Sequence, residues 1–500
     1  MRKKMTKVGL LGLQGVILAL AMMLASCSKG ADCDETFSSN VRGSQLTSPT
    51  LTKANFSQRV NADGSESIQV SWDAVMGAGG YYYRVDNVDG PEPVLLVEGN
   101  TDKSMFLFPK AEDTKYRVTL KTLANEKLDN KGATEETVFA YSTMIDAQTI
   151  PVGSNLVDFV NANIKDTDDE QAFELEAGAN YTIDKELDFG RHKVTFRGNK
   201  VNKPIVTFGY DGVIRTGAGL KIKWIKFDCT EQNSKGVVEC TNDPSDDLMG
   251  GKFGYADKGY YLQDPIIFDD CWFKNVKACL FFTGSYPWGI EDIRVTNCIV
   301  QLDNNGTKYG DAAILCAINN SAVYPKGGSS HTWYGSIRNI TIKESTLYNL
   351  ANNSKNRVIR FQNKDLSKMF ASATGSATLT NNTFIKTMSD KEFGNNTPNA
   401  NTYTITFNGN VLYICARLAK FIQGNNTVIC DVNKNTSFTL PDKTGDGARN
   451  AADFNYCTEE DPGFNEADLK ELDLNAPNGG INLKAKGTIS STIGDPRWLQ

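Results

Sequence analysis

The feature that most constrains the fold is an eight-residue pattern that recurs five times between residues 266 and 412. The pattern is apolar-x-apolar-x-x-small-x-apolar, and the small position holds Cys, Ser or Asn. Successive copies begin 27, 47, 37 and 28 residues apart, so a short constant unit alternates with inserts of variable length. That arrangement is typical of a solenoid protein. The copies begin at Ile266, Ile293, Ile340, Ala377 and Ile405.

A single copy is too short to bury its own apolar positions, so neighbouring copies must stack as parallel strands about 4.8 Å apart. The pattern therefore predicts a right-handed, single-stranded parallel β-helix of about 9 to 12 coils. The small residues should form one inward ladder at a turn, and a polar turn residue such as Asp270 or Asn297 precedes most of them. The expected ladder is Cys271, Cys298, Ser345, Asn382 and Asn410.

Residues 45–148 carry a different pattern of short alternating strands and turns. Trp72 ends one strand and Tyr116 begins another. These features resemble the fibronectin type III fold, in which Trp72 would fill the core and Tyr116 would occupy the tyrosine corner. A short amphipathic helix with Leu156 and Val160 on its apolar side should cap the β-helix. The expected fold class is mainly β, with a fibronectin type III-like β-sandwich followed by the parallel β-helix.

The first 27 residues indicate an export signal, with a positive start, an apolar stretch and then Leu24-Ala25-Ser26-Cys27. This ending resembles a bacterial lipobox, which implies that Cys27 becomes the acylated N-terminus and anchors the protein in a membrane. Acidic residues just downstream resemble the surface-export signal of Bacteroidota lipoproteins. The expected domain plan is a signal peptide (1–27), a tether (28–44), the sandwich (45–148) and the β-helix (155–500), the last with parts at about 155–335 and 336–500.

The chain as a whole resembles Bacteroidota outer-membrane lipoproteins that join a fibronectin type III module to a pectate-lyase-like β-helix, the latter made of two adjacent domains of unknown function. Two C-terminal stretches carry this resemblance, Asp461-Pro462-Gly463-Phe464 and Gly494-Asp495-Pro496-Arg497-Trp498. The resemblance implies a place on the cell surface, beside a glycan-uptake complex. It does not imply a chemistry, because one fold supports many functions.

The net charge and the numbers of histidines and cysteines argue against several classes of function. The net charge is −6, which makes the whole chain a poor nucleic-acid binder. Only two histidines occur, His192 and His331, which argues against a multi-histidine metal site. Nine of the eleven cysteines lie in apolar strand-like sequence without a C-x-x-C motif, so we expect free buried thiols.

The favoured function from sequence is binding of a polysaccharide on the β-helix. Aromatic side chains in the inserts offer faces on which sugars could stack, and the stretch from Gly190 to Phe227 holds nine Lys or Arg against one acid. Outward cations on stacked rungs would attract an acidic glycan. The candidate glycan-binding residues are Tyr286, Trp288, Trp333, Tyr334, Lys221, Lys223 and Arg197.

Two other functions stay open. In a polysaccharide lyase, Arg360 would be the candidate base, because Ile359 and Phe361 should point inward and leave Arg360 outside. Phe281 and Leu315 are expected at the equivalent outward position of neighbouring coils. A structural or adhesive surface protein without catalytic activity is the other alternative.

Calcium is the one cofactor that the sequence suggests. Residues 442–453 are similar to a dockerin-type calcium loop, with Gly447 at the sharp turn. The loop departs from the usual pattern at Thr444 and Arg449, and a plain turn-rich loop is the alternative reading. The candidate ligands are Asp442, Thr444, Asp446, the carbonyl of Ala448, and Asp453.

The lipobox assignment predicts that Cys27→Ala abolishes acylation, because the substitution removes the thiol that accepts the lipid. Metabolic labelling with a radioactive or clickable fatty acid measures this directly. Lipid label that persists on the variant would show that Cys27 is not the anchor.

Overall fold

The computed structural model describes residues 41–255, 259–304, 308–309, 312–318, 335–351, 356–387, 392–415, 417–439 and 451–499. The chain divides into two compact units between Ile145 and Asp146, here called unit 1 and unit 2. In the described residues, no helix is both long and apolar enough to cross a membrane.

Unit 1 is a sandwich of two antiparallel sheets. A three-stranded sheet has the order β1-β2-β5 and a four-stranded sheet has the order β4-β3-β6-β7. One apolar cluster draws side chains from both sheets, including Val70 and Phe106 from the first and Tyr81 and Leu120 from the second. The strands are β1 (Phe56–Val60), β2 (Glu66–Ser71), β3 (Gly80–Asn87), β4 (Val94–Thr101), β5 (Met105–Pro109), β6 (Lys115–Leu123) and β7 (Thr137–Ser142).

Two aromatic residues hold this sandwich as the sequence predicts. The Trp72 side chain is buried and meets Tyr81 edge to face, with ring centroids 5.1 Å apart. The Tyr116 hydroxyl accepts a hydrogen bond of 2.8 Å from the backbone N–H of Ala111, five residues upstream. Tyr116 thereby ties the turn before β6 to the core.

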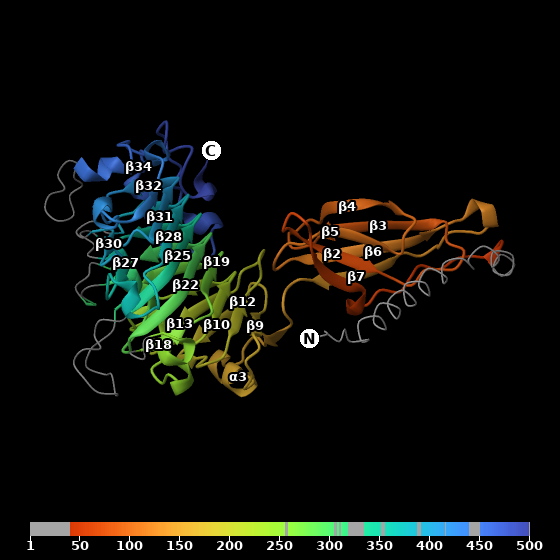
Figure 1. The fold of residues 1–500 in the computed structure, drawn as a ribbon, viewed down its shortest axis with the longest axis horizontal. Helices are drawn as coiled ribbons and strands as arrows, with labels where there is room; N and C mark the ends of the chain where they lie inside the picture. The colour runs from red at the N-terminus through yellow and green to blue at the C-terminus, as the bar shows by residue number, and fades with distance from the viewer. Residues whose placement is uncertain are drawn as a thin grey trace, which may run out of the picture. The chain divides into compact units, whose positions relative to one another are not determined.

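Unit 2 consists of three long parallel sheets that the chain visits in turn, which is the arrangement of a β-helix (Figure 1). Figure 1 shows β12, β19, β22, β25, β28 and β31 of the first sheet stacked along unit 2. The first sheet contains β8 (Ala147–Ile150), β9 (Gln171–Leu175), β12 (Val194–Arg197), β15 (Leu220–Lys223), β19 (Ile266–Asp269), β22 (Trp288–Thr296), β25 (Ser336–Lys343), β28 (Gly375–Thr380), β31 (Tyr403–Asn408) and β33 (Thr427–Ile429), with β18 (Tyr260–Leu262) beside β22.

The other two sheets complete each coil. The second sheet contains β10 (Asn180–Ile183), β13 (Ile205–Phe208), β16 (Lys226–Asp228), β20 (Trp272–Val276), β23 (Ile299–Leu302), β26 (Thr346–Asn349), β29 (Thr383–Ile385), β32 (Asn410–Tyr413) and β34 (Asn435–Phe438). The third sheet contains β11 (Glu186–Asp188), β14 (Val213–Thr216), β17 (Gly236–Cys240), β21 (Cys279–Phe282), β24 (Ala313–Ala317), β27 (Arg357–Phe361) and β30 (Gly394–Asn395).

The register of the first sheet confirms the sequence repeat. Ile266, Ile293, Ile340, Ala377 and Ile405 are successive Cα partners on five neighbouring rungs. All five are completely buried and belong to the core of unit 2. Each copy of the repeat is therefore one rung, and its apolar positions fill the inside of the β-helix.

The predicted ladder of small residues is also present, and hydrogen bonds connect its members. The Ser345 N–H donates to the Asn382 side chain at 3.0 Å, and the Asn382 N–H donates to the Asn410 side chain at 3.2 Å. Asn435 extends the ladder, because the Asn410 N–H donates to its side chain at 3.0 Å. Each amide also donates to a buried carbonyl, as Asn410 does to Leu379 at 2.9 Å. The ladder thus satisfies backbone groups that the turns leave without strand partners.

The turn before the ladder requires an unusual backbone. The residue preceding each of the five predicted ladder positions has a positive φ, for example 50° at Asp270, 52° at Asn297 and 57° at Asn381. Asparagine, aspartate and glycine tolerate this left-handed conformation best. At Gly409, where φ is 74°, an added Cβ would lie 2.1 Å from the Asn381 side-chain oxygen, so close stacking favours glycine there.

The N-terminal end of the β-helix differs slightly from the expected plan. Helix α3 (Leu156–Asn163) forms as predicted, with Asn155 as its N-cap and Leu156, Val157 and Val160 buried. Strand β8 precedes it and pairs in parallel with β9. Unit 2 therefore begins before residue 155, where the sequence predicts its start, because Ile150 packs into the core and accepts a hydrogen bond of 2.8 Å from the Tyr181 hydroxyl.

Residues 461–499, here the C-terminal segment, cover the outer face of the second sheet. Apolar residues that point outward from this sheet, such as Ile299 and Tyr348, share one cluster with Leu472 and Trp498 of the segment. The Trp498 indole N–H donates to the Thr346 hydroxyl at 2.6 Å. The same hydroxyl donates to the Asp495 carboxylate at 2.7 Å. The two C-terminal stretches that carry the family resemblance therefore belong to the segment that covers the second sheet.

Short 3₁₀ helices occupy connections and the C-terminal segment. They are η1 (Lys53–Asn55), η2 (Glu126–Leu128), η3 (Asp246–Leu248), η4 (Gly250–Phe253), η7 (Leu366–Lys368), η8 (Leu418–Lys420), η9 (Val432–Lys434), η11 (Ala451–Asn455), η12 (Glu466–Asp468), η13 (Pro477–Gly480) and η14 (Pro496–Trp498). Cysteines 229 to 457 are free thiols in the described part of the chain, and all but Cys430 are buried, as the sequence predicts.

The ladder predicts that Asn410→Ala lowers the free energy of unfolding of unit 2 by about 2 to 4 kcal/mol, because two buried backbone groups each lose a partner. Urea unfolding measures this change. Asn180→Ala is the matched control, since Asn180 is exposed at the start of β10 and should shift stability by less than about 0.5 kcal/mol. Equal effects of the two substitutions would contradict the stabilising role of the ladder.

Candidate functional site

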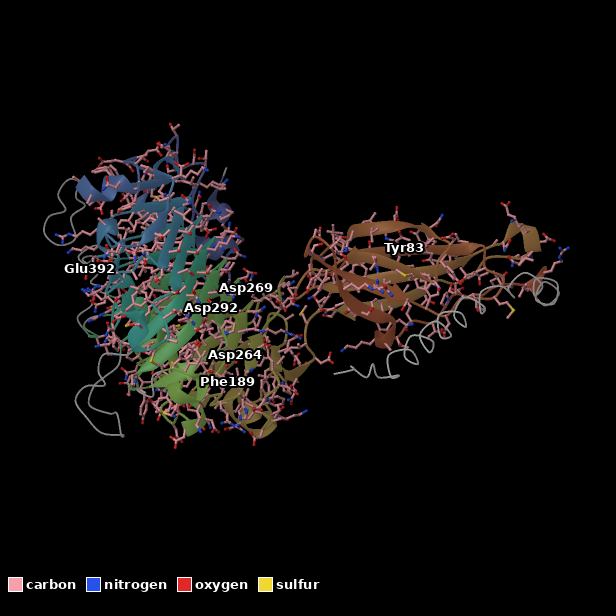
Figure 2. All side chains as sticks on the ribbon, in the orientation of Figure 1. Tyr83, Phe189, Asp264, Asp269, Asp292 and Glu392 are labelled. Carbon is pink, nitrogen blue, oxygen red and sulfur yellow. The ribbon has the colours of Figure 1, made fainter. Side chains whose placement is uncertain are left out.

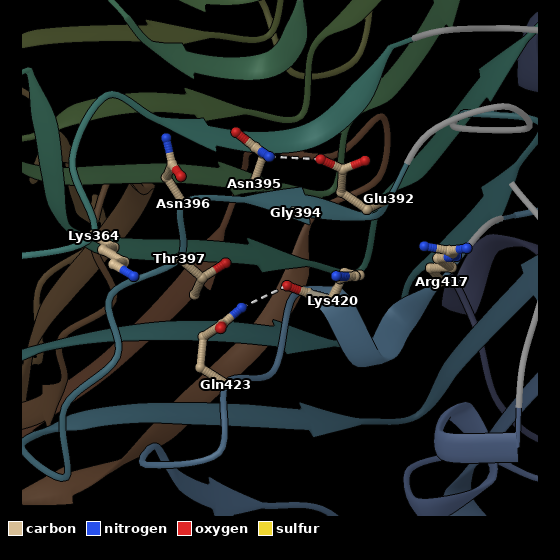
Figure 3. Close-up of a pocket in the computed structure, with 9 residues that line it drawn as sticks. All are labelled: Lys364, Glu392, Gly394, Asn395, Asn396, Thr397, Arg417, Lys420 and Gln423. Atoms are coloured by element: carbon tan, nitrogen blue, oxygen red, sulfur yellow. Dashed lines mark hydrogen bonds between the residues drawn. The ribbon is translucent and has the colours of Figure 1, made fainter. Parts of the chain in front are cut away.

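The three outer faces of the β-helix differ in what they offer a ligand. The C-terminal segment covers the second sheet. The third sheet carries a pocket near its last rungs, with a volume of about 340 Å³. Glu392 is one of the residues that line this pocket. In Figure 2 it lies at the margin of unit 2, away from Asp269 and Asp292 of the first sheet. The pocket is lined by Lys364, Glu392, Gly394, Asn395, Asn396, Thr397, Arg417, Lys420 and Gln423 (Figure 3).

Stacking of rungs brings these residues together. β27 and β30 are neighbouring strands of the third sheet, and Arg360 and Asn395 are Cα partners in this pair. The chain then continues through β31 and β32 and returns to the same side at η8, which contributes Lys420. Residues that are up to about 60 positions apart in the sequence thus line one cavity.

The acidic residue of the pocket is held in an ion pair. The Glu392 carboxylate accepts hydrogen bonds from Arg357 at 3.0 Å and from Asn395 at 2.6 Å. Burial alone would raise the pKa of Glu392, but its own backbone N–H, Arg357 and Asn395 stabilise the ionised form more, so the pKa is held below its ordinary value. Glu392 is therefore a fixed carboxylate that positions Arg357 and Asn395, and a poor acceptor for a further proton.

Three cationic side chains line the rest of the pocket. Lys364 and Lys420 are exposed, and Arg417 is partly buried. Arg417 precedes η8 with φ 22°, an unusual backbone conformation for a residue with a side chain. Lys364 and Lys420 therefore place exposed positive charge along the lining of the pocket, while Arg357 is paired with Glu392.

Thr397 adds a buried hydroxyl to the pocket. Its side chain is 1% exposed, and its oxygen has no hydrogen-bond partner among the described residues. Figure 3 shows this hydroxyl in the middle of the pocket, pointing toward Lys420. A buried polar group without a partner costs stability, so an oxygen-rich ligand would satisfy it.

This arrangement suits recognition of an anionic group on a hydroxyl-rich molecule. Lys364, Arg417 and Lys420 supply positive charge, Thr397 and Asn396 supply neutral hydrogen-bonding groups, and Asn395 is oriented by Glu392. Clefts lined by one sign of charge concentrate ligands of the opposite sign.

Arg360, the candidate lyase base, lies on the rung beside the pocket. Ile359 and Phe361 are completely buried and Arg360 is partly exposed, so the predicted orientation of β27 is confirmed. The predicted equivalents in neighbouring coils were wrong. Leu315 pairs with the inward Ile359, and Arg360 pairs with Cys316. A shift of one residue reverses the face of every side chain in a strand, so the outward partners of Arg360 are Cys316 and then Phe282.

The aromatic candidates occupy other places. Trp288 is completely buried, and its ring lies 5.3 Å from that of Tyr260. It has no exposed face on which a sugar could stack, which corrects the expectation from sequence. Tyr286 is partly buried and packs edge to face on Tyr260 at 5.6 Å. Trp333 and Tyr334 lie outside the described residues.

Lys221 and Lys223 alternate with buried residues of β15 in the first sheet, whereas Arg215 and Lys226 of the basic stretch belong to the third and second sheets. Acids of unit 2 pair with several of these cations. The Lys221 ammonium lies 2.7 Å from the Glu170 carboxylate. Arg197 is nearly buried and lies 2.6 Å from Glu174. Lys223 lies over the Trp224 ring, with 6.0 Å between the ammonium and the ring centroid. Ion pairing replaces the expected free row of cations, because acids on neighbouring rungs lie within reach.

Most of the predicted calcium loop cannot be placed. Residues 441–450, which include Asp442, Thr444, Asp446 and Ala448, lie outside the described residues. Asp453 is described and completely buried, and its carboxylate accepts a hydrogen bond of 2.6 Å from the Ala419 N–H in η8. Asp453 thus supports η8 next to Lys420. Within the described ranges, no group of three or more His, Cys, Asp or Glu is placed to hold a metal ion.

Sequence reasoning missed the pocket residues because no local motif connects them. Lys364, Glu392 and Lys420 stand on three separate inserts, Thr397 shares the insert of Glu392, and none of the four belongs to the repeat pattern. The only available signal was the alignment of β27 with the following coil, which would have placed Asn395 beside Arg360.

Two stretches of the chain match families described only as domains of unknown function. Residues 10–188 match one of them (DUF4992), and residues 179–324 match the other (DUF4957). No curated protein matches the chain. Among solved structures, the chain is similar to pectate lyase PelI from Erwinia chrysanthemi, in complex with tetragalacturonic acid, at 9% identity and a TM-score of 0.13. That match covers 61% of this chain and 84% of the other.

The lowered pKa of Glu392 predicts a pH-dependent contribution to stability. Because the folded-state pKa lies below the unfolded value, the contribution is present above the unfolded pKa and is lost as pH falls through the folded pKa. Glu392→Gln should therefore lower the urea midpoint near pH 7 and have a smaller effect near pH 4. Glu231→Gln, at an exposed carboxyl, is the control. An equal loss at both pH values would contradict an ionised, paired Glu392.

Proposed function

We propose that this protein is a lipoprotein of the outer membrane that binds an acidic polysaccharide at the third-sheet pocket and supports its uptake. The pocket carries the proposal, because it combines three cations with a buried hydroxyl that has no partner among the described residues. Its volume of about 340 Å³ lies near the lower end of the range for small-ligand sites. One charged sugar residue of a longer chain fits that size.

The rest of the chain supports this proposal, because it offers a spacer domain and a lipid anchor for the β-helix. We propose that unit 1 is a fibronectin type III-like spacer. Its sheet orders β1-β2-β5 and β4-β3-β6-β7, the buried Trp72 and the Tyr116 hydroxyl bond support that assignment. The lipobox-like sequence at Cys27 supports a lipid anchor on the same chain. Together these parts would hold the β-helix away from the membrane surface, beside a glycan-uptake complex.

A polysaccharide lyase is the alternative that a specific observation favours. Arg360 is partly exposed on the rung beside Asn395, so a guanidinium stands next to the proposed binding pocket. Lyase cleavage of a uronate polymer forms an unsaturated product that absorbs near 235 nm. An increase in that absorbance with wild-type protein, lost in Arg360→Lys, would establish the lyase. If the protein neither binds nor cleaves a glycan, the structural or adhesive role is the remaining alternative.

Binding is tested with the mature chain, residues 28–500, on an array of acidic and neutral glycans. We expect binding to a uronate polymer such as pectate, weakened by salt because exposed charges are screened. Lys364→Gln with Lys420→Gln should weaken it at least about tenfold, since two of the three cations are lost. These lysines are exposed, so their loss should not unfold unit 2.

The matched control is Lys484→Gln with Lys486→Gln, which removes two exposed lysines of the C-terminal segment and should leave pectate binding unchanged. A second comparison uses Lys221→Glu with Lys223→Glu on the first sheet. Weakened binding in that variant together with full binding in the pocket variant would place the acidic glycan on the first sheet and overturn the pocket proposal.

A further inference from the structure

Five of the short 3₁₀ helices begin with a residue whose side chain caps them. In each, a side-chain oxygen of the N-cap residue accepts a hydrogen bond from the backbone N–H two residues further on. Such a bond satisfies an N–H group that the first turn of a helix leaves without a partner. These N-cap residues are Asn125, Ser245, Asp365, Asp431 and Asp495. Helix η8, which contributes Lys420 to the third-sheet pocket, begins differently.

The N-cap position of η8 holds Arg417, which does not cap the helix. Its side chain makes no cap hydrogen bond, because a guanidinium has donors but no acceptor. Its backbone has φ 22° and ψ 72°, outside the regions that residues with a Cβ ordinarily adopt. Backbone conformations of this kind cost free energy and are found most often at functional sites. Arg417 also lines the third-sheet pocket (Figure 3). The start of η8 therefore departs from the usual capping rule at the point where the chain meets the pocket.

Asp453 supplies the missing cap from another part of the chain. Its carboxylate accepts a hydrogen bond of 2.6 Å from the backbone N–H of Ala419. Ala419 lies two residues after the N-cap position, so this is the N–H that the other helices bind with their own N-cap residue. Asp453 belongs to η11 and is completely buried. A buried carboxylate needs hydrogen-bond donors, so the contact fixes η8 and η11 against each other.

Apolar contacts hold the inner side of η8. Leu418 and Phe421 are buried in the core of unit 2, and the Phe421 ring lies 5.4 Å from the Phe393 ring. An added Cβ at Gly394 would lie 2.5 Å from the Phe421 ring, so β30 passes close to the residue that follows η8. These contacts and the Asp453 bond together give η8 one fixed position beside the pocket.

We propose that Asp453 is a positioning residue of the third-sheet pocket. By capping η8 in place of residue 417, it allows an arginine to stand at that position and contribute a guanidinium to binding of the acidic glycan. The inference rests on the function proposed above, because it assigns Asp453 and Arg417 to the same site. It implies a trade-off at position 417, where a residue that caps η8 well would stabilise the helix and weaken binding.

The trade-off is tested with Arg417→Asn in the chain of residues 28–500. Asparagine is a good N-cap and tolerates a positive φ, so hydrogen exchange followed by mass spectrometry should show equal or slower exchange of the η8 amides. Pectate binding should weaken at least about fivefold, because a guanidinium is lost from the pocket. Lys252→Asn, which removes an exposed cation of η4, is the matched control and should leave binding unchanged.

The capping role is tested with Asp453→Ala, which leaves the side chains of the pocket in place. The η8 amides should exchange at least about tenfold faster, because the bond to a charged acceptor is lost. Pectate binding should weaken at least about fivefold, while the amides of β28 keep their exchange rate and show that the β-helix is folded. Asp453→Asn should restore both properties, since its side-chain oxygen also accepts from an N–H. Glu231→Ala, which removes an exposed acid, should change neither.

Three results for Asp453 would overturn the inference. They are unchanged η8 exchange in Asp453→Ala, faster exchange there with unchanged pectate affinity, and an Asp453→Asn variant that behaves like Asp453→Ala. Full pectate binding by Arg417→Asn would overturn it as well. If the wild-type protein binds no pectate, the proposed function fails, and the exchange rates still decide whether Asp453 caps η8.

Discussion

The stacking of inward residues on successive rungs is the interaction on which the rest of unit 2 depends. Each rung contributes too few apolar side chains to form a core alone, and burial comes only from the rungs above and below. The ladder of Ser345, Asn382, Asn410 and Asn435 keeps this stacking in register, since each side chain bonds the backbone of its neighbour. A slip of one residue would turn the apolar set outward and break every bond of the ladder.

A fixed register gives the β-helix three outer faces. The faces differ in which residues they expose and in what covers them, and these differences restrict where a ligand can bind. The second sheet points apolar residues outward, and the C-terminal segment must cover them, with Trp498 and Asp495 both tied to Thr346. The third sheet gathers cations around a cavity. The first sheet carries paired charges on its early rungs and mainly hydroxyl and amide groups on its later ones. Among the described residues, the second sheet is therefore the face that is least open to a ligand.

Much of the fold was predictable from the sequence, and little of the site was. The spacing of Ile266, Ile293, Ile340, Ala377 and Ile405 predicts the register, because inward positions must be apolar on every rung. Outward positions face no such requirement. The sequence therefore suggested Trp288 as a stacking surface for a sugar, although its side chain is buried against Tyr260. It likewise suggested Lys221 as an unpaired cation, although Lys221 pairs with Glu170. Lys364, Glu392 and Lys420 carry no shared motif, so only stacking brings them to one cavity.

The sequence by itself determined the repeating unit, the residues that point inward and the position of the turn before most ladder residues, because these follow from periodicity and from the residue types that favour turns. Only the tertiary structure decided which outer face is covered, which charges are paired and which residues share the pocket. These outcomes depend on contacts between rungs and inserts far apart in the chain. Insert lengths vary from coil to coil, and no local pattern records which inserts will meet.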